Sequence, residues 1–287
     1  MKLISLTIVR DDAWVLGASL RAALEWVDSA VVLCHACTDR SEEIADGLRV
    51  ETGRVHVLRQ PRQEWDEMDD RQRTLDYARW LEATHVAIVD ADEVLTANLR
   101  PLIRGLLEGM PAGHVLDLPM IPLWRSPLMR RVDPCVWTEA VVTAAVSLVD
   151  GMAWRTGPEG YQHHARPPVG TTGRWRPTVA GGVMHLQWVD WPRVVAKHAL
   201  YRARDWRRWP GRESAERIRW RYSLALREDG LRTEPVPAGW WGPELEYVQP
   251  TGPGWILEAA RREAVALSEV DAAALGVWPL IEEASRG

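Results

Sequence analysis

The chain has 287 residues, a formal net charge of −5, 46% hydrophobic residues and 26% charged residues. This composition is that of a globular protein with a sizeable core, and it excludes a disordered chain. No apolar run is long enough to span a membrane, and three cysteines exclude a disulfide framework. The first ten residues lack the long apolar core of a signal peptide, so we expect a cytoplasmic protein.

Strand-like and helix-like segments alternate through the first 90 residues. Short apolar, β-branched runs predict strands at 3–9, 30–34, 55–58 and 85–90. Apolar residues at helical spacing predict helices between these strands, carrying residues 14–27, 44–48 and 69–81. The alternation predicts an α/β fold with a Rossmann-like, mostly parallel sheet flanked by helices.

The second half of the chain is less regular. We expect a helix at 99–107, strands at 113–120 and 141–148, Gly- and Pro-rich loops at 150–183 and a short strand at 183–188. From residue 191 onward the pattern is helical, at 191–207, at 212–227 and, in two pieces, at 254–284. The sequence therefore predicts a catalytic domain over 1–190 and a helical C-terminal extension over 191–287 that packs on it.

Three carboxylates follow the fourth predicted strand, in the sequence Asp90-Ala91-Asp92-Glu93. Open α/β sheets bind their ligands at the carboxyl ends of their strands. Carboxylate oxygens suit Mg²⁺ or Mn²⁺, which often hold a diphosphate at the same time. The alternative is a solvated acidic turn.

Two cysteines, Cys34 and Cys37, have the C-x-x-C spacing of a zinc or redox pair. No second pair exists, and Cys34 falls inside a strand pattern. The spacing by itself therefore assigns neither role.

The order of motifs over residues 2–205 resembles that of the family 2 glycosyltransferases, which have the nucleotide-sugar-binding fold called GT-A. The matching pieces are Arg10-Asp11-Asp12-Ala13, the turn from Cys34 to Ser41, Arg71, Asp90-Ala91-Asp92-Glu93, Gln162-His163-His164, His185, Lys197 and Tyr201. Two departures stand out. Cys34 and His35 replace the acid that contacts uridine in relatives, and His164 replaces a glutamate of the family's "H-E" segment.

The resemblance implies a metal-dependent glycosyltransferase of the inverting hexosyltransferase type. Such an enzyme moves a sugar from a nucleotide-diphosphate sugar to a hydroxyl acceptor. It also implies that Asp90, Asp92 and His185 hold Mn²⁺ or Mg²⁺, and that Arg10, Asp11, Arg71 and Asp90 contact the donor. For each residue a structural alternative stays open: helix capping for Asp11, an ion pair with Glu67 or Asp69 for Arg71, and a hydrogen-bonded strand histidine for His185.

A catalytic base must deprotonate the acceptor hydroxyl. His164 matches the family's base position and titrates near neutrality. Glu159 lies between two glycines in a loop, where functional side chains are often displayed. We place these two ahead of Glu139 and Asp133.

The segment 193–232 holds 12 Lys or Arg residues against 5 Asp or Glu residues, a net charge of +7. Basic helices with interleaved Trp residues can bind phosphate groups or unstacked bases. The acceptor is then anionic: a phosphorylated glycan, a lipid-linked sugar or a hydroxymethylated base in DNA. The alternative is that these arginines balance the acidic remainder of the fold.

Two other functional classes compete with a glycosyltransferase. One is a non-catalytic module that kept the fold and binds a nucleotide sugar or nucleic acid. The other is a nucleotidyltransferase, which would carry a Gly-rich, basic loop after the first strand; Arg10-Asp11-Asp12 is not such a loop.

Overall fold

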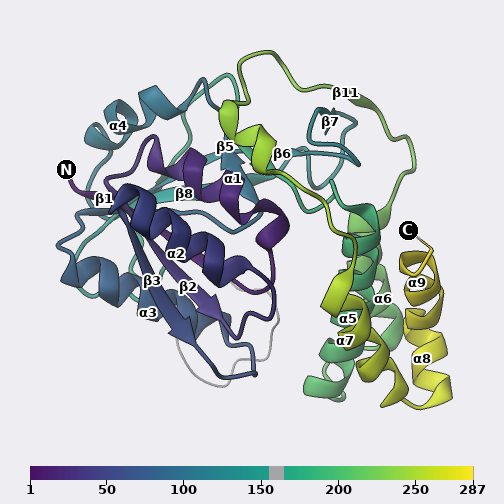
Figure 1. Ribbon diagram of the computed structural model, residues 1–287. Helices are drawn as coiled ribbons and strands as arrows, with labels where there is room; N and C mark the ends of the chain where they lie inside the picture. The colour runs from purple at the N-terminus through teal and green to yellow at the C-terminus, as the bar shows by residue number, and fades with distance from the viewer. Residues whose placement is uncertain (155–164, 287) are drawn as a thin grey trace.

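A curled nine-stranded sheet forms the centre of the protein, in a computed structural model that describes residues 1–154 and 165–286 (Figure 1). The strand order is β3-β2-β1-β4-β8-β6-β10-β5, and β9 pairs with β6. Five of the eight strand pairings are parallel, and β8 and β5 run antiparallel to their neighbours. The strands of this sheet are β1 (Leu3–Val9), β2 (Ser29–His35), β3 (Val55–Gln60), β4 (His85–Ile88), β5 (Glu93–Leu95), β6 (His114–Pro122), β8 (Val141–Ser147), β9 (Gly173–Trp175) and β10 (Val183–His185).

Helices cover both faces of this sheet. One face is covered by α1 (Ala13–Leu24), α2 (Ser41–Thr52) and α4 (Arg100–Glu108), and the other by α3 (Glu67–Trp80). The side chains of β1 alternate accordingly. Leu3 and Val9 pack with the first group of helices, and Ile4 and Leu6 pack with α3. A strand buried on both faces is typical of a parallel sheet, and the predicted α/β class is confirmed.

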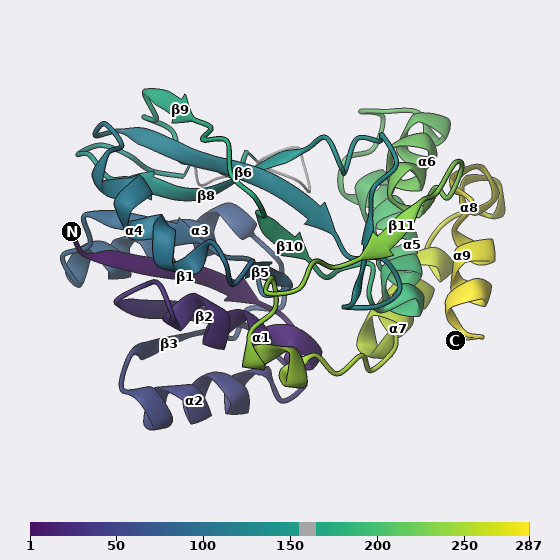
Figure 2. The ribbon, with the colours of Figure 1, turned by 90° about the horizontal axis from the view of Figure 1, so that it is seen from above.

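The C-terminal helices form a lobe beside the sheet (Figure 2). Its long central helix is α5 (Trp191–Arg208), and around it pack α6 (Ala215–Ser223), the 3-10 turn η1 (Leu224–Leu226), α7 (Gly254–Val265), α8 (Glu269–Leu275) and α9 (Val277–Ala284). These helices bury a core of their own, into which Trp188 and Trp124 insert from the sheet side. The division at residue 190 stays a prediction.

The predicted two-piece helix at 254–284 was wrong, because this stretch forms three helices. Ser268 caps α8 by accepting a hydrogen bond from the Asp271 N–H. Gly276 then ends α8 in the left-handed conformation, at φ 61°, so α9 starts in a new direction.

A small separate sheet, formed by β7 (Met129–Arg131) and β11 (Thr233–Pro235), was not predicted. Across the two described ranges, no helix is both long and apolar enough to cross a membrane.

After β11 the chain returns to the sheet domain before entering α7. The 3-10 turn η2 (Pro243–Tyr247) packs on α1, and Glu244 is buried there against Arg100. Both Nη atoms of Arg100 donate to the Glu244 carboxylate, and Nη1 also lies 2.9 Å from Glu25. This ion pair joins the segment between α6 and α7 to α4 and α1.

We expect the Arg100–Glu244 pair to make the fold sensitive to acid. Burial alone would raise the pKa of Glu244, but the hydrogen bonds and charge of Arg100 outweigh it and hold that pKa below its ordinary value. The stabilisation is therefore complete above the unfolded-state pKa of about 4.3 and is lost as the pH falls through the lower folded-state pKa. Thermal unfolding followed from pH 7 to pH 3 should show a shallower acid decline for Glu244→Gln than for the matched variant Glu246→Gln. Equal declines would contradict this role.

Candidate functional site

The acidic turn, Asp90-Ala91-Asp92-Glu93, lies where the sheet topology predicts a bound ligand. From β1 the chain steps outward to β2 and β3 on one side, whereas β4 lies on the other side of β1. Ligands of open α/β sheets bind at the carboxyl ends of strands beside such a switch point. The turn begins two residues after β4 ends, at Asp90, and β5 starts at Glu93.

Two arginines hold the Asp90 carboxylate, one on each oxygen. Oδ1 accepts a hydrogen bond from Arg71 Nη2 at 3.1 Å, and Oδ2 accepts one from Arg166 Nη1 at 3.0 Å. Arg71 is itself buried and also binds Glu67 at 2.8 Å. Burial would raise the pKa of Asp90, but Arg166 and Arg71 together lower it, so this carboxylate stays ionised.

Arg166 is the residue that sequence reasoning missed. Its guanidinium binds both Glu93 oxygens, Asp90, and the backbone carbonyls of Ile88 (2.7 Å) and Thr143 (2.8 Å). It therefore ties the end of β4, the acidic turn and β8 together. Burial opposes the charge, but Asp90 and Glu93 raise the pKa of Arg166 further above its ordinary value. No local pattern marks Arg166, because its partners lie more than 70 residues away in the sequence, apart from Thr143.

Asp92 faces a second set of partners, which come from β10 and α5. β10 pairs antiparallel with β5, with His185 opposite Glu93, so His185 Nε2 lies 3.4 Å from Asp92 Oδ2. Lys197, in the second turn of α5, places Nζ 4.0 Å from the same oxygen. Burial opposes each charge, but the attraction of His185 lowers the pKa of Asp92, and Asp92 in turn raises the pKa of His185. The predicted neighbours Asp92 and His185 thus do lie together.

Two side chains of this cluster, Asp92 and His185, are suited to bind a divalent cation. Among residues 1–154 and 165–286, no three His, Cys, Asp or Glu side chains are grouped closely enough to hold a metal. Asp92 and His185 supply one carboxylate and one imidazole, whereas both Asp90 oxygens are bonded to arginines. Mg²⁺ and Mn²⁺ sites that serve phosphate chemistry commonly use one or two protein ligands and complete the shell with phosphate and water. Asp90 therefore fits better as an oriented acid than as a ligand, and the metal site stays a prediction.

Asp11 organises the neighbouring loop and does not cap α1. It is buried with a left-handed backbone, at φ 56°, and its Oδ1 accepts hydrogen bonds from the backbone N–H groups of Thr38 and Asp39. Asp39 instead binds the first N–H of α1, that of Ala13, at 2.9 Å. Asp11 thus joins the ends of β1 and β2. Its predicted contact with the nucleotide-sugar donor stays a prediction.

Arg10 reaches across to the segment that follows β3. It donates to the backbone oxygen of Gln63 at 2.8 Å and lies over the Trp255 ring, 5.1 Å from its centroid. His35, at the end of β2, is fully buried, and its Nδ1 lies 2.5 Å from Asp70 Oδ2. The predicted contact of Arg10 with the nucleotide-sugar donor stays a prediction.

The two proposed bases, Glu159 and His164, lie outside the described residues. Of the lower-ranked candidates, Asp133 is buried and bound to both Nε and Nη2 of Arg131, so it is not free to take a proton. Glu139 is exposed. Trp188 is fully buried in the core of the C-terminal lobe.

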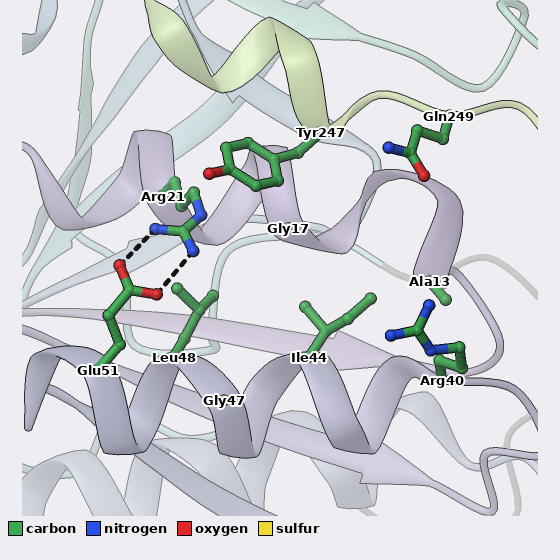
Figure 3. A pocket seen from close by; sticks show the side chains of 10 residues that line it. All are labelled: Ala13, Gly17, Arg21, Arg40, Ile44, Gly47, Leu48, Glu51, Tyr247 and Gln249. Atoms are coloured by element: carbon green, nitrogen blue, oxygen red, sulfur yellow. Dashed lines mark hydrogen bonds and ion pairs between the residues drawn. The ribbon is translucent and has the colours of Figure 1, made fainter.

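A pocket of about 320 Å³ lies elsewhere, between α1, α2 and η2 (Figure 3). Arg21 and Glu51 form a two-bond ion pair across one end of it, and the Arg21 guanidinium lies over the Tyr247 ring. The pocket shares no lining residue with the acidic turn. We therefore do not assign it to the chemistry of Asp90 and Asp92.

No protein-family model matches the chain, and no curated protein matches it. Solved structures resemble it in part. The mannosyltransferase PcManGT from Pyrobaculum calidifontis, in complex with GDP-Man and Mn²⁺, is 11% identical over 99% of this chain and 86% of that one, with a TM-score of 0.44. Residues 1–349 of S. aureus TarS are 15% identical over 44% of this chain, with a TM-score of 0.34, and the matched part spans 36% of that chain. The glucosyl-3-phosphoglycerate synthase from Mycobacterium tuberculosis, in complex with Mn²⁺, UDP and phosphoglyceric acid, is 16% identical over 44% of each chain, with a TM-score of 0.31.

Proposed function

We propose that this protein is a metal-dependent glycosyltransferase that uses a nucleotide-diphosphate sugar. The observation that carries the proposal is the convergence of Asp92, His185 and Lys197 beside an Asp90 carboxylate that two arginines hold in place. This cluster lies at the strand edge where α/β sheets bind phosphorylated ligands. It combines acids for a cation with basic groups for a diphosphate.

Each residue of the cluster has a distinct role. Asp92 and His185 would hold the divalent cation, which when bound neutralises charge on the leaving diphosphate. Lys197 supplies a fixed positive charge on the α5 side: burial would lower its pKa, but Tyr201 and Asp92 raise it above the ordinary value. Asp90, held by Arg71 and Arg166, is oriented to accept hydrogen bonds from the donor ribose or sugar.

The transfer itself needs a base for the acceptor. In an inverting reaction the acceptor oxygen attacks the anomeric carbon, the sugar–phosphate bond breaks, and the base takes the hydroxyl proton. His164 and Glu159 are the candidates for that base. Glu159→Gln and His164→Gln, compared by donor turnover at saturating acceptor, identify it as the variant with the larger loss of kcat.

Binding of the nucleotide-sugar donor is tested by thermal shift. We expect one nucleotide-diphosphate sugar to raise the midpoint of unfolding, and to do so only with Mn²⁺ or Mg²⁺ present, because a ligand that binds the native state stabilises it by mass action. At 100 times its Kd the ligand would contribute about 2.7 kcal/mol. A shift without turnover in the presence of hydroxyl acceptors would favour the non-catalytic binding module. The absence of a shift with every donor would overturn the proposal.

We also propose that the acceptor is anionic, and that the exposed face of α6 receives it. Arg217, Arg219 and Trp220 are exposed there, and Arg219 has no carboxylate partner in the described parts of the chain. Arg217 makes only a long 3.9 Å pair with Glu213, whereas Arg207 pairs with Glu263 and Arg221 with Asp205 at shorter distances.

Charge reversal tests the acceptor surface. Because each basic side chain near an anionic surface contributes about 1 kcal/mol, Arg217→Glu combined with Arg219→Glu should weaken binding to anionic-lipid vesicles by at least about tenfold. The donor-induced thermal shift should not change. The matched control is Arg40→Glu, which changes an exposed arginine at the N-terminus of α2, outside the basic segment 193–232. Failure of the wild-type protein to bind anionic vesicles, DNA and phosphorylated glycans would contradict an anionic acceptor.

A further inference from the structure

Cys34 and Cys37 meet at the ends of β1 and β2. Cys34 is fully buried near the end of β2, and in the parallel pairing with β1 it lies opposite Val9. The chain then bends at Ala36, which has a left-handed backbone at φ 45°. This bend brings Cys37 back to the same place, with its Sγ 3.4 Å from the Val9 carbonyl oxygen. Both side chains contact one hydrophobic cluster.

The two side chains both lie beside Val9, and their surroundings differ. The hydrogen bond from Cys34 and that from the Asp11 backbone N–H outweigh burial and lower the pKa of Cys37. The same contact with Cys37, together with burial, raises the pKa of Cys34. Cys37 is partly exposed to solvent, whereas Cys34 is not. An accessible, thiolate-prone cysteine next to a buried thiol is the arrangement of a redox-active pair.

We propose that Cys34 and Cys37 form a reversible intramolecular disulfide, in which Cys37 reacts first and Cys34 resolves it. With hydrogen peroxide as oxidant, the Cys37 thiolate attacks the peroxide, the O–O bond breaks, and Cys37 becomes a sulfenic acid as hydroxide leaves. The Cys34 sulfur then attacks the Cys37 sulfur, an S–S bond forms, and the sulfenic hydroxyl leaves as water with the Cys34 proton. Overall, two thiols and one peroxide give one disulfide and two waters.

The location of the pair gives the disulfide a consequence. The residues after Cys37, Thr38 and Asp39, are the ones whose N–H groups bind Asp11. A covalent bond at Cys37 would fix the start of this loop against β2. The oxidation state of the pair therefore sets how firmly the loop is held at the strand ends beside the acidic turn.

The experiment is quantitative thiol trapping on the full-length protein. The protein is treated with hydrogen peroxide in small molar excess, quenched, alkylated with N-ethylmaleimide and weighed intact. We expect the loss of two alkylation sites and of the mass of two hydrogen atoms, full reversal by dithiothreitol, and a peptide map that links residue 34 to residue 37. The isolated third cysteine, Cys135, should remain alkylated.

Matched variants separate this pair from other oxidation. Cys135→Ser should form the disulfide as the wild type does, whereas Cys37→Ser should form none. Cys34→Ala should stop at a sulfenic acid on Cys37, which dimedone traps; if this variant is poorly folded, the peptide map of Cys135→Ser decides alone. Oxidised Cys135→Ser that still accepts two alkyl groups, or links that join two molecules, would overturn the proposal.

Discussion

Replacing Arg166 with leucine should lower the free energy of unfolding by about 3–5 kcal/mol, the usual cost of breaking a buried ion pair by removing one partner. The side chain of Arg166 is 16% exposed and that of Glu93 is 3% exposed, so the Glu93 carboxylate cannot be rehydrated without opening the turn. The carbonyls of Ile88 and Thr143 would also lose their donor. Urea unfolding followed by tryptophan fluorescence measures the effect.

The control for Arg166 is an arginine of similar chemistry at the surface. Arg174 pairs with the buried Asp117, but its side chain is 43% exposed, and Arg176 binds the same carboxylate. Arg174→Leu should therefore cost about 1 kcal/mol or less, in the range of exposed ion pairs. Equal losses for the two variants would show that Arg166 is not the residue that holds the acidic turn.

Replacing Asp92 with asparagine should lower kcat by at least about 10²-fold, the effect of removing one group that stabilises charge in a transition state. Asparagine keeps the shape of the side chain but removes the negative charge that faces His185 and Lys197. Because Asp92 also attracts the ammonium group of Lys197, a small loss of stability accompanies the loss of activity. Release of nucleotide diphosphate from the donor identified by thermal shift, with and without Mn²⁺, is the measurement.

The control for Asp92 is Asp46→Asn on α2, where the carboxylate pairs with Arg49 and Arg59 at the surface. This variant should keep full turnover. If Asp92→Asn keeps full turnover and the same response to Mn²⁺, the metal assignment is wrong, whatever the fate of the donor-binding proposal.

The parts of the fold that follow from local patterns could be predicted. The β1, β2, β3 and β4 strands are short apolar runs, and their alternation with helices gives the parallel sheet. The position of Asp90 and Asp92 at the strand edge follows from the same pattern. The pattern also predicted a short strand that contains His185, whereas its place beside Asp92 was implied only by the resemblance to the glycosyltransferases.

The interactions that fix the site could not be predicted, because they join residues far apart in the chain. Arg166 binds acids at positions 90 and 93, and Glu244 binds Arg100. The Asp39 carboxylate accepts hydrogen bonds from the first N–H groups of two helices, Ala13 of α1 and Ser41 of α2. Polar partners of this kind leave no periodic signal, since a single side chain at the correct distance is enough.

The path of the chain between α6 and α7 has a consequence for motion. A lobe joined to a sheet domain by one crossing could swing on that crossing, but this lobe is joined at residue 190, where Asp190 also binds the N–H groups of Thr251 and Gly252, and again through η2. At the start of α5, Arg193 also donates hydrogen bonds to the backbone oxygen of Asp11 and to the Asp12 carboxylate on the sheet side. The spacing between Lys197 on the lobe and Asp92 on the sheet is thus set by folding and not by the arrival of a substrate. The electrostatic field at this edge is therefore built before any ligand binds, which spares the protein the reorganisation that a closing site would need.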